Sequence, residues 1–397
     1  MHQLISLDEA KAKIFAQLKR KSFPKMPVDV FGGYWLGESV TAEIDSPPFD
    51  SSAVDGFCVR SQDRALDRFR IVGEIAAGQT QDFEISQGEC RRIYTGARVP
   101  PDCSIIMLED TRVADEVMCP VVKIEEGEYI RPRGSDFAAG TQIASEGDYI
   151  NAPKMATLVS GGVSKIVGFT HLNIAVLTSG NELIKVGQSR DASQIYNSCE
   201  AAFRVELRAL ADTFEHRHVG DNYMAIKRAA CELLDKFEVL ISVGGMSAGE
   251  HDLLRKVYED IGVEQIFFGV NIRPGKPFYF GIYKDKLVFG LPGNPVSALV
   301  TYALLVKPAL RYIAGSAIPL PVQAILSKDI SRADQRPEFV RGRTSIEKAV
   351  FHVVPIESRE SHQVKGLADA DCLIHLPEGV GRLTKGELVD ITMLSWT

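Results

Sequence analysis

The chain has 397 residues, of which 45% are hydrophobic and 24% are charged, a balance typical of folded globular proteins. This length predicts about two to four domains with ample apolar material for their cores, so neither disorder nor a disulfide scaffold is expected. The net charge of -7 comes from 45 basic and 52 acidic residues. It argues against a nucleic-acid-binding protein with a broad basic face, but it leaves room for a small anionic ligand.

The cysteines and the apolar segments bear on the cellular compartment. Seven cysteines are scattered along the chain and none is arranged as Cys-x-x-Cys, which predicts free thiols in a reducing compartment. The N-terminus has the charge and periodicity of a helix and not those of a signal peptide. The most apolar later stretch, residues 296–306, is shorter than the roughly 20 residues that a membrane span needs. We therefore expect a cytoplasmic protein that contacts neither membrane nor nucleic acid.

The N-terminal third is predicted to contain an inserted domain. A capping box that begins at Ser6, followed by apolar residues at helical spacing, predicts a helix over residues 7–20. Between residues 46 and 140, short β-prone segments alternate with Gly, Pro and Asp turns, which predicts a β-rich domain. Residues 1–45 and 141–170 flank this insertion, and we group them as an N-terminal helical and linker domain.

Strand and helix patterns alternate over residues 171–318. HLNIAVLTSG, EVLISVGG and KLVFGLPG have the composition of buried strands, and helical patterns lie between and after them. This alternation predicts an α/β domain around a mostly parallel sheet that is covered on both faces. Short strand patterns return over residues 319–397, which predicts a C-terminal β-barrel-like domain. The fold class is therefore a multidomain α/β protein with additional β-rich domains.

The segment LISVGGMSAGEHDL, residues 240–253, combines a strand, a glycine-rich loop and a capped helix start. Ligands of open parallel sheets bind beyond the carboxyl ends of the strands. Gly244, Gly245 and Gly249 would let backbone N–H groups approach a phosphate closely, next to the positive end of a helix. The alternative is a tight turn between strand and helix without a ligand.

The start of the following helix carries a candidate metal ligand. Asp252 lies in the first predicted turn beside the candidate phosphate site, where its carboxylate can hold Mg2+. Ser247 and Glu250 form a capping box, which by itself explains both residues.

Two other strand ends carry comparable loops. TSGNEL puts Glu182 just past a strand, and GLPGNPVSA puts Pro292, Asn294 and Pro295 in a rigid turn before a helix. Three such loops at one edge of a sheet are expected to line a single crevice with Glu182 and Asp252 as its acids. A helix cap is the alternative role for Glu182.

Basic and histidine side chains provide further candidates. RPGKP brings Arg273 and Lys276 together around a glycine turn, which suits a tetrahedral oxyanion, whereas a solvated basic turn is the alternative. His216 and His218 lie two residues apart on a strand-like segment without a third ligand, so we expect surface residues and no metal site. Spacing alone indicates only turns in PPFDSSAVDGFCV, YTGARVPPD and RPRGSDFAAG.

These segments resemble, in order and over nearly the whole chain, the MoeA family of molybdopterin molybdenumtransferases, which includes the C-terminal domain of gephyrin. The matching stretches are PPFDSSAVDGF, YTGARVP, RPRGSDFAAG, TSGNEL, SVGGMSAGEHD, RPGKPFYFG and FGLPGNPVSA. The resemblance implies four subdomains and an elongated homodimer. It also implies Mg2+-dependent insertion of molybdate into adenylylated molybdopterin with release of AMP.

The resemblance also assigns roles residue by residue. Active-site roles fall on Asp55, Thr95, Asp136, Glu182, Asp221 and Asp252. The first three would belong to the β-rich part and face the crevice of the partner subunit, while Glu182 and Asp252 would hold Mg2+. Binding of the substrate phosphate and the oxyanion falls on Gly244, Gly245, Ser247, Gly249, Arg273, Lys276, Pro292, Asn294, Pro295, Ser297, Arg341 and Ser361.

The chain departs from the family pattern at a few positions. Arg273 and Gly269 stand where lysines are common, and Ser51 replaces an asparagine. Two other functions stay open: an adenylyltransferase that makes the adenylylated pterin, and a non-catalytic dimeric scaffold. A regulatory paralogue that handles tungstate is a further alternative. The adenylyltransferase and proteins of molybdoenzyme maturation are candidate partners.

Overall fold

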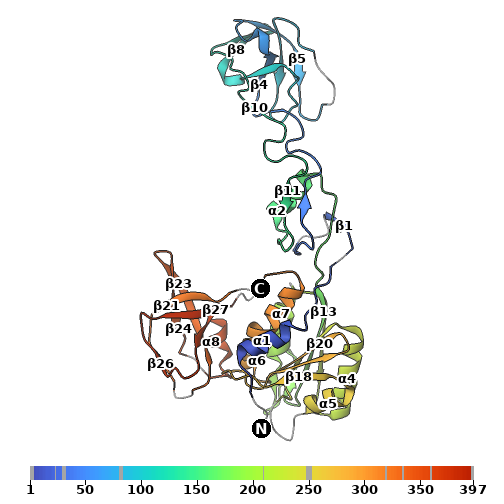
Figure 1. The fold of residues 1–397 in the computed structure, drawn as a ribbon, viewed down its shortest axis with the longest axis vertical. Helices are drawn as coiled ribbons and strands as arrows, with labels where there is room; N and C mark the ends of the chain where they lie inside the picture. The colour runs from blue at the N-terminus through green and yellow to red at the C-terminus, as the bar shows by residue number, and fades with distance from the viewer. Residues whose placement is uncertain are drawn as a thin grey trace. The chain divides into compact units, whose positions relative to one another are not determined.

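The computed structural model describes residues 4–22, 24–28, 33–79, 84–208, 210–246, 253–317, 320–332, 335–357 and 360–394. Its contacts divide the chain into two compact units (Figure 1). The first comprises Met1–Ser22 with Phe169–Thr397, and the second comprises Phe23–Gly168.

The first unit is built on a six-stranded sheet. In spatial order its strands are β16 (Ala211–Val219), β13 (Leu172–Ser179), β17 (Val239–Val243), β20 (Lys286–Leu291), β19 (Tyr279–Tyr283) and β18 (Glu264–Phe268). The first four strands are parallel, and β19 and β18 add an antiparallel edge. The predicted mostly parallel sheet is therefore confirmed.

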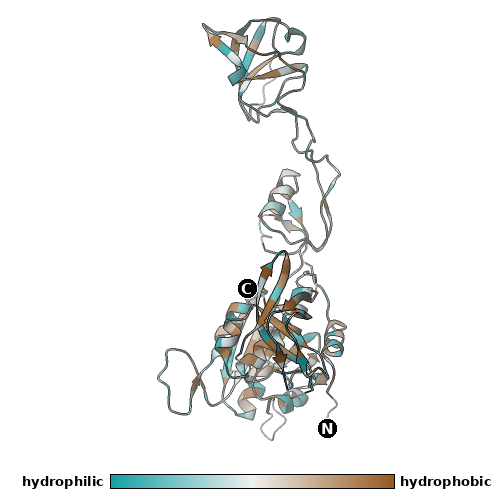
Figure 2. Cartoon of the chain, turned by 90° about the vertical axis from the view of Figure 1, so that its left-hand side faces the viewer, coloured by the Kyte–Doolittle hydropathy of each residue, from teal (hydrophilic) through white to brown (hydrophobic). Residues whose placement is uncertain are grey.

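Helices cover both faces of this sheet. They are α3 (Ser198–Glu206), α4 (Tyr223–Lys236), α5 (Leu253–Ile261), α6 (Pro295–Thr301) and α7 (Lys307–Ile313). Successive side chains of β13 enter different cores: Ile174 joins the cluster under α3 and α6, whereas Ala175 joins the cluster under α4 and α5. This alternation explains why the middle of the strand, residues 174–177, is apolar at every position instead of every second one. Figure 2 shows these strands as the most hydrophobic part of the unit.

Helices α6 and α7 form one helical stretch with a π-helical turn, Tyr302–Val306, between them. Pro308 has no backbone N–H to continue the ladder, which accounts for the wider turn just before it. Pro295–Ile313 is long and apolar enough to cross a membrane by length and composition, but 72% of it is buried inside the protein. Its burial in the core explains its apolar composition. The stretch is longer than the apolar segment 296–306 suggested.

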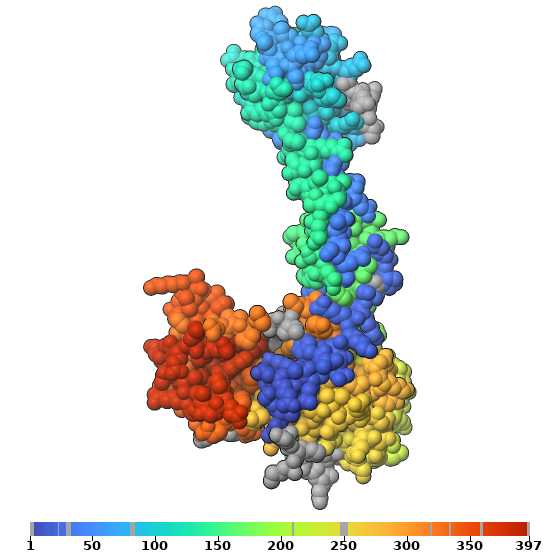
Figure 3. Space-filling model, in the orientation of Figure 1, coloured from blue at the N-terminus to red at the C-terminus, as the bar shows by residue number. Residues whose placement is uncertain are grey.

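The N-terminal helix packs on this unit. α1 (Leu7–Phe15) is capped by Ser6, whose Oγ accepts the N–H of Glu9 at 3.1 Å, and it buries Ala10 and Ile14 in the sheet core. Figure 3 shows the N-terminal segment, in dark blue, lying against the yellow part of the unit. The helix ends before residue 20. The expected grouping of residues 1–45 thus differs from the contacts, which divide that range at Ser22.

A closed five-stranded barrel completes the first unit. Its strands are β21 (Val322–Leu326), β24 (Val350–Pro355), β23 (Glu338–Glu347), β25 (Cys372–Leu376) and β27 (Leu388–Met393). Buried aliphatic side chains such as Leu326, Val353 and Ile391 fill its interior. Short pieces β22 (Ile330–Ser331), β26 (Arg382–Leu383) and α8 (Val364–Ala368) lie outside the barrel pairing. The β-barrel-like prediction for this part matches the topology.

The second unit contains a second six-stranded sheet. In spatial order its strands are β7 (Cys103–Met107), β4 (Gly56–Arg60), β6 (Glu89–Ile93), β5 (Phe69–Ile75), β9 (Val117–Pro120) and β8 (Thr111–Ala114). Phe57 and Val59 face one small core and Cys58 faces another. A separate core lies around α2 (Ala152–Ser160) with the paired strands β1 (Met26–Pro27) and β12 (Lys165–Ile166), and β2 (Val40–Thr41) and β11 (Gln142–Ala144). Strands β3 (Ser51–Ser52) and β10 (Ile130–Arg131) also pair.

Candidate active site

A cavity of about 680 Å³ lies at the carboxyl ends of β13, β17 and β20. It is lined by the loops that follow these three strands, and each loop contributes residues that the sequence singled out. The lining includes Glu182, Gly244, Gly245, Pro292, Asn294, Pro295 and Ser297. We call it the sheet-edge cavity. The three loops that were expected to line a single crevice therefore do share one.

Glycines allow these loops to approach each other closely. Gly244 has a φ of +96°, and a Cβ atom there would lie 2.7 Å from the backbone oxygen of Ser179 on the neighbouring strand. A Cβ atom on Gly293 would lie 3.3 Å from the Cα of Gly244. Both the positive φ and the close contact disfavour any other residue at position 244.

Two buried polar atoms of the sheet-edge cavity have no partner. Ser179 Oγ and Asn294 Oδ1 are both buried and make no hydrogen bond within the described part of the chain. Buried polar atoms are nearly always hydrogen-bonded in folded proteins. Both residues line the cavity, so a bound ligand can supply the missing partners.

Two carboxylates, Glu182 and Asp221, line the same cavity and are exposed. Asp221 is held by a reciprocal pair of bonds: its Oδ2 accepts the N–H of Asn181 at 3.1 Å, and its own N–H donates to Asn181 Oδ1 at 3.0 Å. The cluster of acids is small, since the described residues contain no group of three metal-binding side chains. Mg2+ is usually held by one or two carboxylates together with phosphate and water oxygens, so the donors fit this ion.

The other predicted acid of this cavity cannot be placed. Asp252 lies outside the described residues, as do Ser247, Gly249 and Glu250. The pairing of Glu182 with Asp252 around Mg2+ therefore stays a prediction.

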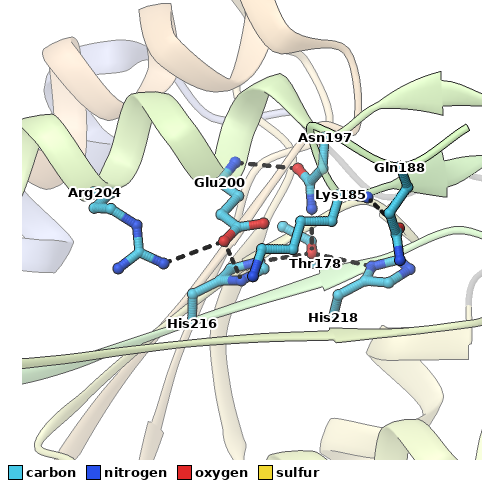
Figure 4. Close-up of polar contacts among 8 residues, drawn as sticks. All are labelled: Thr178, Lys185, Gln188, Asn197, Glu200, Arg204, His216 and His218. Atoms are coloured by element: carbon cyan, nitrogen blue, oxygen red, sulfur yellow. Dashed lines mark hydrogen bonds and ion pairs between the residues drawn. The ribbon is translucent and has the colours of Figure 1, made fainter.

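A polar network connects Thr178 and Asn197, which line the sheet-edge cavity, to two histidines (Figure 4). Thr178 Oγ1 lies 2.8 Å from Asn197 Nδ2, 3.0 Å from His216 Nε2 and 3.2 Å from His218 Nδ1. A hydroxyl donates one hydrogen bond and accepts two, so one histidine nitrogen accepts from Thr178 and the other donates to it. Asn197 Oδ1 in turn accepts the N–H of Glu200 at 3.1 Å.

The network corrects the expectation that both histidines are surface residues. The His216 side chain is only 5% exposed, and its Nδ1 lies 3.3 Å from Glu200 Oε1. Burial lowers its pKa below the usual histidine value, although the Glu200 carboxylate opposes this effect. His218 is exposed, as expected. The spacing of the two histidines could not predict that His216 is buried. Its burial depends on contacts of β16, an edge strand, with helix α3.

A second, smaller cavity of about 240 Å³ lies between the RPGKP loop and the barrel. It brings together the residues that were expected to bind an oxyanion: Arg273, Lys276, Ser297, Arg341 and Ser361. We call it the basic cavity. Arg273 is anchored on both sides, because its N–H donates to Pro337 O at 2.9 Å and its carbonyl accepts the N–H of Phe339 at 2.8 Å.

Four cations and two carboxylates line the basic cavity, so cations predominate. Arg341 is 4% exposed, and its guanidinium donates to the backbone oxygens of Gln363 at 2.9 Å and Glu360 at 3.3 Å. Burial lowers its pKa from the usual arginine value, and the charge of Glu360 opposes that shift. Arg273 and Lys276 form no ion pair with any described residue. Such a site favours an anion.

The sheet-edge cavity and the basic cavity adjoin. Pro277 and Ser297 line both of them, and Ser297 is buried at the start of α6. A ligand in one cavity would therefore lie next to a ligand in the other.

Three predicted residues belong to the second unit. Asp55 and Thr95 contact each other: Asp55 Oδ1 accepts both the N–H of Thr95 at 2.8 Å and its hydroxyl at 2.9 Å, which lowers the pKa of Asp55. Asp136 is exposed, and its backbone N–H donates to Ser46 O at 2.9 Å.

The structure also adds residues that the sequence did not single out for binding. Thr178, Ser179 and Asn197 line the sheet-edge cavity, and Glu338 lines the basic cavity. Asn197 also caps helix α3, because its Oδ1 accepts the backbone N–H of Glu200. Gly269, which the resemblance places where a lysine is common, has a φ of +90°, a backbone conformation that disfavours a lysine side chain.

Comparisons with known proteins agree with this architecture. Residues 5–162 match the MoeA N-terminal region (domain I and II), residues 175–312 the probable molybdopterin binding domain, and residues 323–394 the MoeA C-terminal region (domain IV). The molybdopterin molybdenumtransferase of Staphylococcus aureus (strain MSSA476) is 28% identical over 368 residues, which cover 90% of this chain and 88% of the relative. That of Staphylococcus epidermidis (strain ATCC 12228 / FDA PCI 1200) is 27% identical over 407 residues, covering 98% and 95%.

A solved structure extends the similarity to the fold. The crystal structure of a molybdopterin biosynthesis MoeA protein from Pyrococcus horikosii is similar with a TM-score of 0.80 at 27% identity, and the match covers 98% of this chain and 99% of that one. The three matched regions follow one another along the chain between residue 5 and residue 394. The similarity to the solved structure covers nearly the same length. This chain belongs to the MoeA family.

Proposed function

We propose that this chain is a molybdopterin molybdenumtransferase, which inserts molybdenum from molybdate into adenylylated molybdopterin and releases AMP. This is a late step of molybdenum cofactor biosynthesis. The observation that carries the proposal is the adjacency of the two cavities, which share Pro277 and Ser297. The reaction needs an anhydride and an oxyanion held side by side, and this pair of cavities suits them.

The sheet-edge cavity is the proposed site for the phosphate anhydride. Its volume suits a ligand of nucleotide size. Backbone N–H groups at Gly244 and Gly245 would approach the phosphate, and Ser179 Oγ and Asn294 Oδ1 would find partners on the substrate. These contacts orient the anhydride toward the basic cavity.

Glu182 and Asp221 are the described carboxylates that would hold Mg2+, with Asp252 as the predicted third acid. When bound, Mg2+ neutralises charge on the anhydride oxygens as AMP departs. Two hydrogen bonds with Asn181 hold Asp221 in place two residues after β16, where its carboxylate would be available to the ion.

The basic cavity is the proposed molybdate site. Arg273, Lys276 and Arg341 offer charge-assisted donors to a tetrahedral oxyanion, and the hydroxyls of Ser297 and Ser361 add neutral ones. Insertion of the metal and loss of AMP would then be coupled by proximity.

The direct test measures AMP release from adenylylated molybdopterin by the purified chain, with and without molybdate and with and without Mg2+. We expect release that requires both, and removal of Mg2+ with a chelator should stop it until Mg2+ is restored. The variant Asp252→Ala should be impaired, and unimpaired release would remove Asp252 from the mechanism. Consumption of ATP to form adenylylated pterin would instead indicate an adenylyltransferase, and no molybdate dependence at all would favour a scaffold.

We further propose a cytoplasmic homodimer in which Asp55, Thr95 and Asp136 of one subunit complete the site of the other. Seven free cysteines support a reducing compartment. The arrangement of subunits rests on the family resemblance, and a mixed-dimer experiment described below tests it.

A further inference from the structure

Glu338 is the buried carboxylate of the basic cavity, and a negative charge there does not suit an anionic ligand. Glu338 is 6% exposed and lines the cavity together with Arg273, Lys276, Arg336 and Arg341. Its Oε2 atom is buried and makes no hydrogen bond with any described residue. A buried carboxylate oxygen without a donor is costly, so the occupant of the cavity is expected to supply one.

The backbone fixes Glu338 in this position. It begins β23 and pairs with Leu376 of β25, so the barrel holds it on one side. On the other side it forms a parallel bridge with Arg273, through the backbone bonds that join Pro337 and Phe339 to that residue. The backbone of Glu338 is therefore part of the junction between the RPGKP loop and the barrel, which places its side chain beside the basic cavity.

Glu338 and a tetrahedral oxyanion compete for the same donors. An ionised carboxylate accepts hydrogen bonds and donates none, and a fully deprotonated oxyanion also has only acceptor oxygens. Two such groups facing each other in a small cavity repel, and the neighbouring cations cannot sit between every pair of oxygens. A single proton between a carboxylate oxygen and an oxyanion oxygen turns this repulsion into a strong hydrogen bond.

We propose that Glu338 shares one proton with the oxyanion bound in the basic cavity, so that the cavity accepts molybdate and rejects sulfate. This inference rests on the proposed function, because it takes molybdate as the occupant. The molybdate dianion is a stronger base than the sulfate dianion, because hydrogenmolybdate is a weaker acid than hydrogensulfate, so molybdate retains the shared proton more readily. Binding of molybdate then takes up one proton from solvent, and no covalent bond is made or broken.

The charged groups that face this carboxylate are limited. Arg273 and Lys276 come from the RPGKP loop, Arg336 and Arg341 come from the segment around β23, and Glu360 comes from the loop after β24. Glu360 is the only other carboxylate among the described lining residues, and it is exposed, so solvent can satisfy it. Glu338 is therefore the group expected to take up the proton.

The test measures binding of molybdate alone and of sulfate alone to the purified chain by titration calorimetry, at several pH values from neutral to mildly alkaline. In the unaltered protein, one proton should be taken up per molybdate, so Kd should rise about tenfold per pH unit. Sulfate should bind far more weakly than molybdate. In Glu338→Gln the amide can donate directly to an oxyanion oxygen, so the pH dependence should disappear and sulfate should compete.

Matched variants make the outcome specific. Glu347→Gln removes the same charge from the exposed end of the same strand and should leave both the pH dependence and the preference for molybdate unchanged. Glu360→Gln should also keep the pH dependence, and its loss there would overturn the assignment to Glu338. If Glu338→Gln fails to fold, Glu338→Asp keeps a carboxylate and should retain the proton uptake with weaker binding; loss of that uptake would count against the proposal.

The proposal and the proposed function fail in different ways. Retention of both the pH dependence and sulfate rejection in Glu338→Gln would overturn the role of Glu338, even if AMP release depends on molybdate. Absence of any molybdate binding by the unaltered chain would overturn it as well. Proton-linked molybdate binding without AMP release would leave this inference standing and would contradict the proposed function.

Discussion

At the scale of single residues, burial decides which charged side chains can serve a ligand. Arg341 is almost fully buried, and its guanidinium donates to two backbone oxygens, which hold it in place without neutralising its charge. Such a group is fixed in place before any ligand arrives, so little ordering entropy is lost on binding. An exposed cation such as Lys276 contributes charge but not the same rigidity.

This difference predicts a strong effect of Arg341→Ala. Loss of a charged donor in the basic cavity should lower molybdate-dependent AMP release by about one to two orders of magnitude. Arg341→Lys should recover only part of it, because an ammonium lacks the planar fork. Arg343→Ala, at an exposed position two residues further along β23, is the control and should retain activity. Equal losses in the two alanine variants would indicate a general defect of the barrel.

A partly buried histidine, His375, predicts how the stability of the barrel depends on pH. His375 Nε2 lies 2.7 Å from Thr392 Oγ1, and burial lowers the pKa of His375 to about 4. The unfolded chain binds this proton near pH 6.5, so the native state loses stability as pH falls from about 6.5 to about 4. Chemical denaturation should show a decrease of up to about 3 kcal/mol in the free energy of unfolding over this range. His375→Gln should flatten that part of the profile relative to the unaltered chain, and an identical profile would contradict the assignment.

At the scale of elements, the ends of β13, β17 and β20 meet because the strands are parallel neighbours in one sheet. The cavity at this edge forms only because the loops pass close to each other at Gly244 and Gly293. The shape of the sheet-edge cavity thus depends on close contacts between loop backbones as well as on the polar side chains that line it.

Gly244→Ala tests this dependence. The new methyl group would lie 2.7 Å from Ser179 O, so we expect both a loss of stability of more than about 1 kcal/mol and strongly impaired AMP release. Gly187→Ala is a matched control, because Gly187 has a φ of +91° but a Cβ atom there would meet nothing within 4 Å. It should lose about 1 kcal/mol from the backbone effect alone and keep its activity. Thermal melts and AMP release, measured on the same preparations, separate the two effects.

At the scale of the whole molecule, the predicted site residues are divided between two compact units. Asp55 and Thr95 are joined in one unit, while Glu182, Asp221 and the basic cavity belong to the other. A homodimer with two-fold symmetry would allow each subunit to complete the site of its partner.

Mixed dimers test this arrangement. Asp55→Asn and Glu182→Gln should each be inactive alone, whereas co-expression should restore about a quarter of the activity, because half of the dimers contain one intact site of two. If all site residues acted within one subunit, every site in the mixture would keep one defect. No recovery in dimers shown to contain both variants would therefore reject the shared site.

The sequence by itself determined the alternation of strands and helices, the glycine-rich loops at three strand ends and the order of motifs that identifies the family, because each is a local pattern. Local patterns also located Arg273 and Lys276. No local pattern points to Arg341 and Ser361, which only the family resemblance named, and the tertiary structure shows that they line the same cavity as Arg273. It also placed His216 under α3 and Glu338 at the junction of loop and barrel. The residues that bury each of these side chains and form its hydrogen bonds come from distant parts of the sequence. Local sequence patterns therefore cannot reveal the environment of these side chains.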